Sequence, residues 1–478
     1  MADSKEKKRY FFKNLGMFGL ATLIPKILTF LMLPLYTACL SREEYGMADL
    51  LNNTYSLLAP FLTIQVQDAV MRFSLLGHEK KEDVLSIGVL IVAIGGVLLS
   101  VVCACLHRSG LLAVPPGFLL FLCVLYFGNV FQNIFAYFCR GINRVDVIAT
   151  VSILHGITVV GCNLLFLLHF HWGLYGYWMA SALGVLLADF FYVFRVGIFR
   201  FLAAGRVSRA LLRKMVLFSV PMLFSAISWW VNNASDKYIL TFYNGVSAVG
   251  LYAVSSKIPS VLSAFGAIVS QTFSISAIKE FNPDDSDGFL GDIYSAVSFF
   301  SFFICSLLIL CNIPLAKILF SESFFPAWQY APPLLIAAAF NQVSMSCQNI
   351  LMGIGETGII FRTSLIGALV NTTLNFTLIP SYGTYGAAVA TVVGFFVVWI
   401  LRYIEVGKYV RLKHHFIKEV ASYALATLQM ITAFYGNRFV FFQICLCLCI
   451  VLLFKNMIRV YTRTAFVSAT KLWHSFKK

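Results

Sequence analysis

Several basic residues occur inside stretches of sequence that are otherwise apolar enough to enter a bilayer. Lys26 directly follows Pro25 in the middle of FGLATLIPKILTF (18–30), and Lys257 stands two residues before Pro259. A charge at the centre of a spanning helix costs on the order of 2.5–3.5 kcal/mol, so such side chains normally face a bundle interior or a wet cavity. Several cations around one cavity suit an anion, and the candidate anion-binding residues are Lys26, Arg72, Lys237 and Lys257.

Two carboxylates lie close in sequence to these cations. Asp68 is four residues before Arg72 and shares its helix face, so the two charges could simply neutralise each other. Asp236 directly precedes Lys237, and adjacent helical residues point in different directions, so these side chains are not expected to pair. Asp68 and Asp236 are the candidates for binding a coupling ion, H⁺ or Na⁺, and a counter-ion role is the alternative.

Aromatic and amide side chains lie near Asp236 in the same stretch. Rings and amides suit a carbohydrate, although tryptophans also form belts at membrane interfaces. The candidate sugar contacts are Trp229, Trp230, Asn232 and Asn233. The remaining cations of the apolar stretches, Lys13, Lys317 and Arg402, lie near the ends of predicted helices, where long side chains extend to the surface.

The composition identifies the environment in which these residues lie. Of the 478 residues, 59% are apolar and 12% are charged, and the mean hydropathy is +0.83. Soluble domains have about 25% charged residues. Lipid must therefore surround most of the chain, and the absence of alternating polarity leaves helices as the spanning elements.

Apolar runs of the length that spans a bilayer as a helix recur along the whole chain. We expect an all-α polytopic membrane protein with about fourteen spans. They are placed near 12–40, 47–76, 84–106, 117–139, 147–170, 174–194, 215–243, 249–278, 293–318, 332–354, 359–380, 385–406, 420–436 and 439–457.

Lysine and arginine predict the orientation. With the N-terminus inside, most basic residues fall in the tails and the even-numbered connections, whereas the opposite side holds only Arg42, Arg108 and Arg438. This bias predicts cytoplasmic N- and C-termini. The net charge of +15 is therefore a topology signal and a contact for membrane lipids rather than a nucleic-acid surface.

The two sides of a basic linker resemble each other. Gly173-Leu-Tyr-Gly176 precedes Gly184 at the spacing with which Gly383-Thr-Tyr-Gly386 precedes Gly394. Six spans separate the copies, so they share orientation and form a parallel pseudo-twofold repeat. The predicted organisation is a first six-helix lobe (1–194), a basic cytoplasmic linker (195–214), a second six-helix lobe (215–406), and two peripheral C-terminal helices with a basic tail (407–478).

The sequence offers little for an enzyme or a bound cofactor. It has no G-x-x-x-x-G-K-[S/T] loop for ATP phosphates, no H-E-x-x-H and no G-x-S-x-G. The acidic cluster Asp284-Asp285-Ser-Asp287 lacks the bidentate glutamate of a calcium loop. The twelve cysteines are scattered and contain no C-x-x-C. We therefore expect neither a cofactor nor a metal.

The chain resembles a known family in two regions. PKILTFLMLPLY (25–36) followed by LSREEYGMAD (40–49) is similar to the opening of bacterial polysaccharide transporters, the Wzx-like oligosaccharide flippases. DKYIL (236–240) and VGLYAVSSK (249–257) are similar to the start of their second lobe. The resemblance implies the fold of the multidrug/oligosaccharidyl-lipid/polysaccharide (MOP) superfamily, with two bundles in a V and basic residues in the central cavity.

The same resemblance implies a function. It predicts a flippase, and not an enzyme, that moves a polyprenyl-pyrophosphate-linked oligosaccharide to the outer leaflet of the bacterial cytoplasmic membrane by alternating access. The product would serve synthesis of a cell-surface polysaccharide such as an exopolysaccharide or O-antigen, with polysaccharide assembly enzymes as partners. Two alternatives stay open: a MATE-like ion-coupled multidrug exporter, and an integral-membrane glycan polymerase or transferase.

Overall fold

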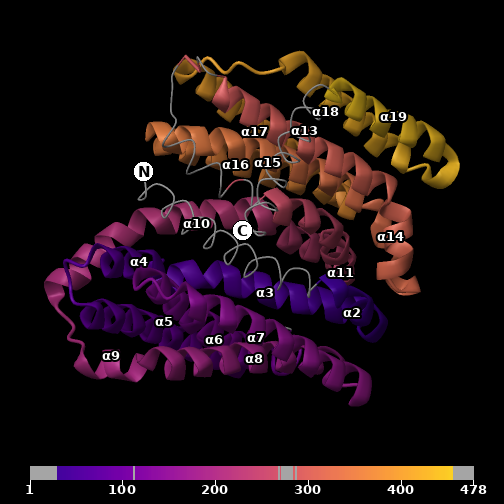
Figure 1. Cartoon of the computed structure of the whole chain (residues 1–478). Coiled ribbons are helices and arrows are strands. Elements are labelled where there is room, and N and C mark those ends of the chain that lie inside the picture. The colour runs from indigo at the N-terminus through magenta and orange to yellow at the C-terminus, as the bar shows by residue number, and fades with distance from the viewer. Residues whose placement is uncertain (1–29, 111–113, 267–269, 271–283, 286–287, 456–478) are drawn as a thin grey trace, which may run out of the picture. The chain divides into compact units, whose positions relative to one another are not determined.

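The computed structural model describes residues 30–110, 114–266, 270, 284–285 and 288–455, and the regular elements in these ranges are all helical (Figure 1). Eight described helices are long and apolar enough to cross a membrane. A ninth span results if Val246–Ser255 and Lys257–Gly266, which meet at a 44° bend, count as one. The predicted polytopic α-helical class is confirmed, whereas the number of fourteen spans stays a prediction.

The chain packs into two compact units. The first comprises Met1–Ala253 with Leu319–Phe324, and the second comprises Val254–Ile318 with Phe325–Lys478. These units follow packing, whereas the predicted lobes follow the repeat, so the lobe boundaries stay a prediction. Most of α10 (Arg209–Asn244) belongs to the second predicted lobe, whereas by packing the helix belongs to the first unit.

The first unit is a bundle of long helices connected by short loops. The second predicted span is interrupted at Ile64 and Gln65, both in the left-handed region with φ of 51° and 54°. The helices are α2 (Leu33–Cys39), α3 (Arg42–Thr63), α4 (Val66–Leu76), α5 (Lys81–Ser109), α6 (Phe118–Gly141), α7 (Val145–Asn163), α8 (Gly173–Tyr192), α9 (Ile198–Ala204), α10 (Arg209–Asn244) and α11 (Val246–Ser255), with π-helical segments Leu164–His169 and Val193–Gly197.

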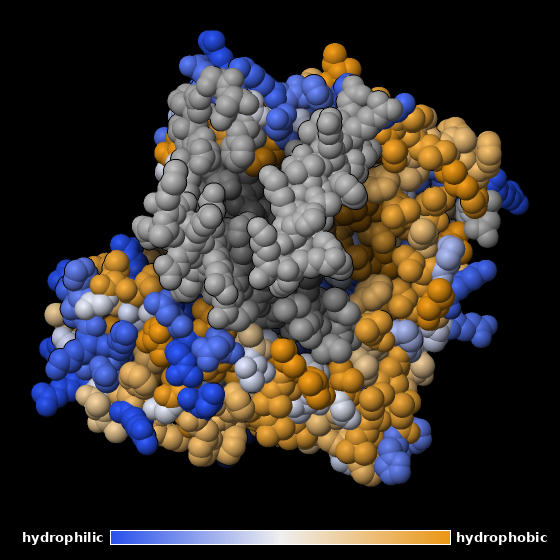
Figure 2. Space-filling view, viewed as in Figure 1, coloured by the Kyte–Doolittle hydropathy of each residue, from blue (hydrophilic) through white to orange (hydrophobic). Residues whose placement is uncertain are grey.

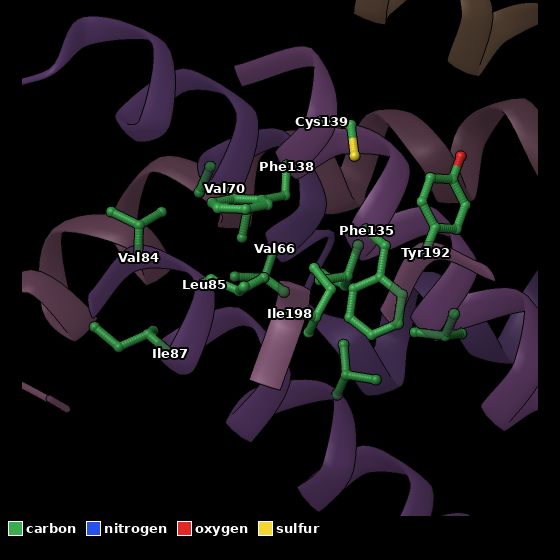
Figure 3. Close-up of a cluster of buried hydrophobic side chains, with 14 of the residues drawn as sticks. Val66, Val70, Val84, Leu85, Ile87, Phe135, Phe138, Cys139, Tyr192 and Ile198 are labelled. Atoms are coloured by element: carbon green, nitrogen blue, oxygen red, sulfur yellow. The ribbon is translucent and has the colours of Figure 1, made fainter. Parts of the chain in front are cut away.

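An apolar core joins α4, α5, α6, α8 and α9 (Figure 3). Val66 and Val70 of α4 lie against side chains of α5 and α6, and Ile198 of α9 enters the same cluster. These three side chains are at most 1% exposed. Burial of this kind fixes the inner faces of the helices. Much of the surface in Figure 2 is hydrophobic, as expected for helices that face lipid.

The motif LSREEYG (40–46) begins α3 with a capping box. Ser41 Oγ accepts a hydrogen bond from the Glu44 N–H, and the Glu44 carboxylate accepts one from the Ser41 N–H. Glu44 Oε1 also accepts the Leu174 N–H over 3.2 Å at the start of α8. Gly173 is needed there because its φ is +51° and a Cβ would lie 2.7 Å from Glu44 Oε1.

The second unit contains the helix Lys257–Gly266 and the helices of the rest of the chain. Its α15 is its most buried span. The other elements are α13 (Phe289–Leu310), α14 (Asn312–Leu319), a 3₁₀ segment (Glu322–Gln329), α15 (Ala331–Ile354), α16 (Thr357–Tyr382), α17 (Thr384–Tyr409), α18 (Phe416–Ala433), a short 3₁₀ turn (Gly436–Phe439) and α19 (Val440–Leu453). The last residue of α14 and the start of the 3₁₀ segment lie in Leu319–Phe324, which packs with the first unit.

Buried hydrogen bonds attach α18 to α13. Ser295 Oγ donates to Glu419 over 2.6 Å, and Ser306 Oγ donates to Gln429 Oε1 over 2.5 Å. Gln429 Nε2 returns a hydrogen bond to the Ser306 carbonyl oxygen over 3.0 Å. α18 was expected to be peripheral, but its polar side chains are part of the interior of the second unit.

Corresponding glycines of the repeat have corresponding roles. Gly383 starts α17 with φ of +54°, as Gly173 starts α8. A Cβ at Gly184 would meet Val159 of α7, and a Cβ at Gly394 would lie 2.9 Å from Asn371 Cβ of α16. The spacing seen in the sequence therefore reflects the same close approach of two consecutive helices in each half.

Candidate functional site

An ion pair lies in the first unit, between α3 and α10. Lys237 Nζ is 2.8 Å from Asp49 Oδ2, and the two side chains are only 13% and 16% exposed. Lys237 is seven residues before the last residue of α10, about 10 Å from that helix end at 1.5 Å per residue. Asp49 therefore neutralises this cation inside the helix bundle.

Hydrogen bonds extend the contact along both helices. Asn53 Nδ2 donates to Asp49 Oδ2 over 2.9 Å. The Thr54 hydroxyl bonds the Tyr238 hydroxyl over 2.8 Å. The Trp230 indole N–H donates to the Asn53 carbonyl oxygen over 3.1 Å. Polar contacts thus join α3 and α10 over several turns.

Asp236 has partners of its own. It is 5% exposed, and its Oδ2 accepts the Tyr252 hydroxyl of α11 over 2.5 Å. Its Oδ1 accepts the backbone N–H of Lys237 over 2.9 Å. The Lys237 ammonium pairs with Asp49 instead, so the two adjacent side chains use different partners, as the helical geometry predicts.

Arg72 lies at a different level of the bundle. Its guanidinium carbon is 4.4 Å from the centroid of the Phe218 ring on α10. Phe218 precedes Lys237 by nineteen residues on one helix, or about 28 Å. One diphosphate cannot contact both Arg72 and Lys237 in this conformation, although both were predicted to line one cavity.

Asp68 does not neutralise Arg72. Both residues are described, yet no ion pair within 4 Å joins them, and Arg72 is an exposed side chain. Asp68 is half-buried in the first turn of α4, directly after the interruption at Ile64 and Gln65. Among the described residues, neither Asp68 nor Arg72 has an oppositely charged group within that distance, although the Asp68 carboxylate accepts a hydrogen bond from Gln65 and is attracted by Arg140.

The other two predicted cations are less defined. Lys257 begins the helix Lys257–Gly266 in the second unit and is half-buried. Within the described ranges, no carboxylate lies within 4 Å of it. Lys26 lies outside the described residues, so its predicted role stays a prediction.

The predicted sugar contacts are described only in part. The side chains of Trp229, Asn232 and Asn233 lie outside the description. Trp230 is 8% exposed, its N–H is bound to α3, and its ring centroid is 5.5 Å from that of Tyr238. In this conformation Trp230 joins two helices and does not present its ring to a ligand.

A buried arginine in the second unit was misjudged from the sequence. Arg402 is 5% exposed and donates hydrogen bonds to the hydroxyls of Thr363, Ser344 and Ser364 over 3.2, 2.9 and 2.8 Å. The expectation that it extends to the membrane surface is wrong, because its helix face points toward α15 and α16. The distance of Arg402 from the end of its helix does not indicate which neighbouring helices its side chain faces.

The arrangement of helices is shared with solved membrane transporters. The lipid II flippase MurJ, in an inward closed conformation, matches over 92% of this chain and 98% of its own, with a TM-score of 0.72 and 14% identity. An inward-facing multidrug resistance MATE family transporter of the MOP superfamily matches over 82% of this chain and 98% of its own, with a TM-score of 0.64 and 13% identity. The chain therefore shares the fold of these two proteins.

Residues 11–275 match the family described as "Polysaccharide biosynthesis protein", and the chain belongs to this family. It is also 27% identical over 224 residues to an uncharacterized membrane protein of Methanocaldococcus jannaschii. That match covers 44% of this chain and 42% of the relative, which is less than half the length of either. The predicted family is confirmed by this match, and the long apolar helices make the chain a multi-pass membrane protein.

Proposed function

We propose that the protein moves a polyprenyl-pyrophosphate-linked oligosaccharide from the cytoplasmic to the outer leaflet by alternating access. It would do so in a bacterial cytoplasmic membrane, with both termini inside, for synthesis of a cell-surface polysaccharide. Family membership and the fold shared with a lipid II flippase support a lipid-linked glycan as cargo. A diphosphate and sugars need a polar path, because burying them in hydrocarbon is prohibitive.

The observation that carries the proposal is that two cations lie at different levels along α10, one on the neighbouring α4 and one on α10 itself. Arg72 lies beside Phe218 without a described counter-ion, and Lys237 lies deep in the bundle, held by Asp49. Arg72 would receive the diphosphate at the cytoplasmic end, and Lys237 would bind it near the external end. Lys26 and Lys257 would complete the cationic wall.

The ion pair between Asp49 and Lys237 would make the separation of α3 from α10 depend on the substrate. Asp49 and Lys237 join the second and seventh spans, which belong to different lobes of the predicted repeat. Breaking a buried pair leaves an uncompensated charge that costs about 3–5 kcal/mol. A diphosphate that replaces Asp49 as the partner of Lys237 would offset this cost, so separation of α3 and α10 would follow arrival of cargo.

The driving force is a separate matter within the same proposal. Asp68, a half-buried carboxylate beside the helix interruption with no ion pair within 4 Å among the described residues, is the better candidate for binding H⁺ or Na⁺. Asp236 is hydrogen-bonded to Tyr252 and fits a structural role in this conformation. Interrupted spanning helices with free polar groups are common at ion sites of transporters.

Reconstituted vesicles test the proposal. A fluorescent polyprenyl-pyrophosphate-linked oligosaccharide is placed in both leaflets, and an impermeant quencher reports how fast the inner pool moves outward. We expect the protein to accelerate this movement, and Lys237→Gln to slow it at least about tenfold, since one ionic contact is worth about 1.4 kcal/mol or more. Unchanged movement of the lipid together with uptake of a cationic dye would instead identify a multidrug exporter.

A further inference from the structure

A cavity of about 650 Å³ lies where α8 passes into α9, away from the ion pair. This volume is within the range of small-molecule sites, about 300–1,000 Å³. Its lining combines basic, aromatic and aliphatic side chains. The residues are Glu82, Val193, Phe194, Arg195, Val196, Gly197, Phe199, Arg200 and Phe201.

The two arginines of this cavity carry charges that the described residues do not neutralise. Arg195 and Arg200 are exposed, and no carboxylate of the described ranges lies within 4 Å of either. Glu82 is the one acid of the described lining, so two arginines share the cavity with a single carboxylate. Two other nearby acids have partners elsewhere: Glu79 pairs with Lys214 over 2.9 Å, and Asp83 accepts the Arg206 backbone N–H over 2.7 Å. The described lining therefore keeps a net positive charge, which favours an anionic ligand.

The level of the cavity matches that of phospholipid headgroups. Arg195 follows Gly173, the first residue of α8, by twenty-two residues, or about 33 Å of helix. The hydrocarbon core is about 30 Å thick. A helix that begins at one membrane surface therefore brings Arg195 to the headgroups of the other leaflet.

Apolar side chains lead from the hydrocarbon to the arginines. Phe190, Phe194 and Phe199 are 60%, 68% and 69% exposed, and the rings of Phe190 and Phe194 lie 4.3 Å apart. Leu186 and Leu187 continue this exposed face one turn deeper. A ligand that fits both parts has acyl chains and an anionic head, which excludes free phosphate as the natural occupant.

The backbone around the cavity is held in place. The π-helical turn Val193–Gly197 ends at Gly197, whose φ of +75° favours glycine. Ile198, the next residue, is 1% exposed in the core shown in Figure 3. Gly205 packs so closely on α5 that a Cβ would collide with Ser86 Oγ. The site is thus formed before a ligand binds, which favours affinity.

We propose that this cavity binds the headgroup of an anionic phospholipid, with the phosphate between Arg195 and Arg200 and the acyl chains along Phe190 and Phe194. Guanidinium groups bind phosphate through paired, charge-assisted hydrogen bonds. The bound lipid would hold the connection between α8 and α10 at the membrane surface. This inference does not depend on the cargo of the transporter.

Native mass spectrometry of the full chain, stripped of lipid and titrated with phosphatidylglycerol or phosphatidylcholine, tests the proposal. We expect tight binding of one phosphatidylglycerol and at least about tenfold weaker binding by Arg195→Gln/Arg200→Gln, since each lost contact is worth about 1.4 kcal/mol or more. The matched control is Arg209→Gln/Arg213→Gln, which removes the same charge from exposed residues of the same linker outside the cavity. It should bind like the unchanged protein, and thermal unfolding would confirm that both variants are folded.

Three results would overturn the proposal. Equal loss of binding in the two double variants would show only general attraction between the basic linker and anionic lipid. Equal binding of phosphatidylcholine would remove the role of charge. Displacement of phosphatidylglycerol by millimolar inorganic phosphate, or by a polyprenyl diphosphate at a tenth of its concentration, would assign the cavity to a free anion or to the transported lipid.

Discussion

Lys237 and Asp49 form a buried ion pair, with 2.8 Å between Nζ and Oδ2. The pair joins α3 to α10 and leaves Lys237 without a free charge for another anion in this conformation. Any role of Lys237 in binding cargo therefore requires that Asp49 first give up its partner. Stability and transport can be separated experimentally at this pair.

Removing one member of the pair should destabilise the protein more than removing both. Lys237→Met leaves the Asp49 carboxylate buried without a cation, and losses of about 3–5 kcal/mol are usual for such changes. Lys237→Met combined with Asp49→Asn should recover most of the lost thermal stability, because no charge remains. Additive losses in the double variant, measured by thermal unfolding in detergent, would contradict a direct pair.

Exchanging the two residues should keep stability and lose transport. Asp49→Lys with Lys237→Asp preserves an ion pair between α3 and α10 but moves the cation to α3. If the diphosphate binds a cation at position 237, the exchanged protein loses this ionic contact. Transport in vesicles should then fall at least about tenfold, which corresponds to about 1.4 kcal/mol. Full transport by the exchanged protein would show that the pair only joins the two helices.

Arg72 should matter for transport and little for stability. Its contact with Phe218 is a cation–π interaction at an exposed site, worth about 0.5–1 kcal/mol. We expect Arg72→Gln to lower transport of the lipid-linked oligosaccharide about tenfold while the unfolding temperature hardly changes. Arg108→Gln, at the last turn of α5, is the matched control. If both variants transport equally well, Arg72 has no part in receiving cargo.

The sequence could predict the cations of the membrane but not their partners. Lys237 was recognisable because it interrupts an apolar stretch, and its independence from Asp236 followed from helical geometry alone. Asp49 was visible as an acid near the start of its helix, yet nothing in the sequence places it beside residue 237. Such pairing depends on which helices are neighbours, and that is decided by packing over the whole bundle.

The sequence also could not show whether two residues on one helix face contact each other. Asp68 and Arg72 are four residues apart and share a helix face, yet Arg72 contacts the Phe218 ring rather than Asp68. The helix is also interrupted at Ile64 and Gln65, directly before α4. By contrast, the repeated glycines were predictive, because close approach of two helices leaves room only for a hydrogen at those positions.

Arg402 should tolerate an apolar side chain of similar length. It is buried beside three hydroxyls, and no carboxylate of the described residues lies within 4 Å to offset its desolvation. Arg402→Met removes the buried charge and fills most of its space, so the relief of desolvation should offset much of the loss of three hydrogen bonds. Arg402→Ala leaves a cavity and should destabilise by about 2–4 kcal/mol. Strong destabilisation by methionine, equal to that by alanine, would show that the charge itself is required.

The contact between Gln429 and Ser306 should be an energetic link between α18 and α13. Gln429 is fully buried, and its amide exchanges two hydrogen bonds with Ser306, one to the hydroxyl and one to the carbonyl oxygen. Ser306→Ala leaves Gln429 Oε1 without its donor, at a cost of about 1–3 kcal/mol. Gln429→Leu with Ser306→Ala should cost less than the sum of the single changes, because the double variant buries fewer unpaired groups. Thermal unfolding of the four proteins measures this coupling, and a coupling near zero would mean that α18 is held by its apolar contacts alone.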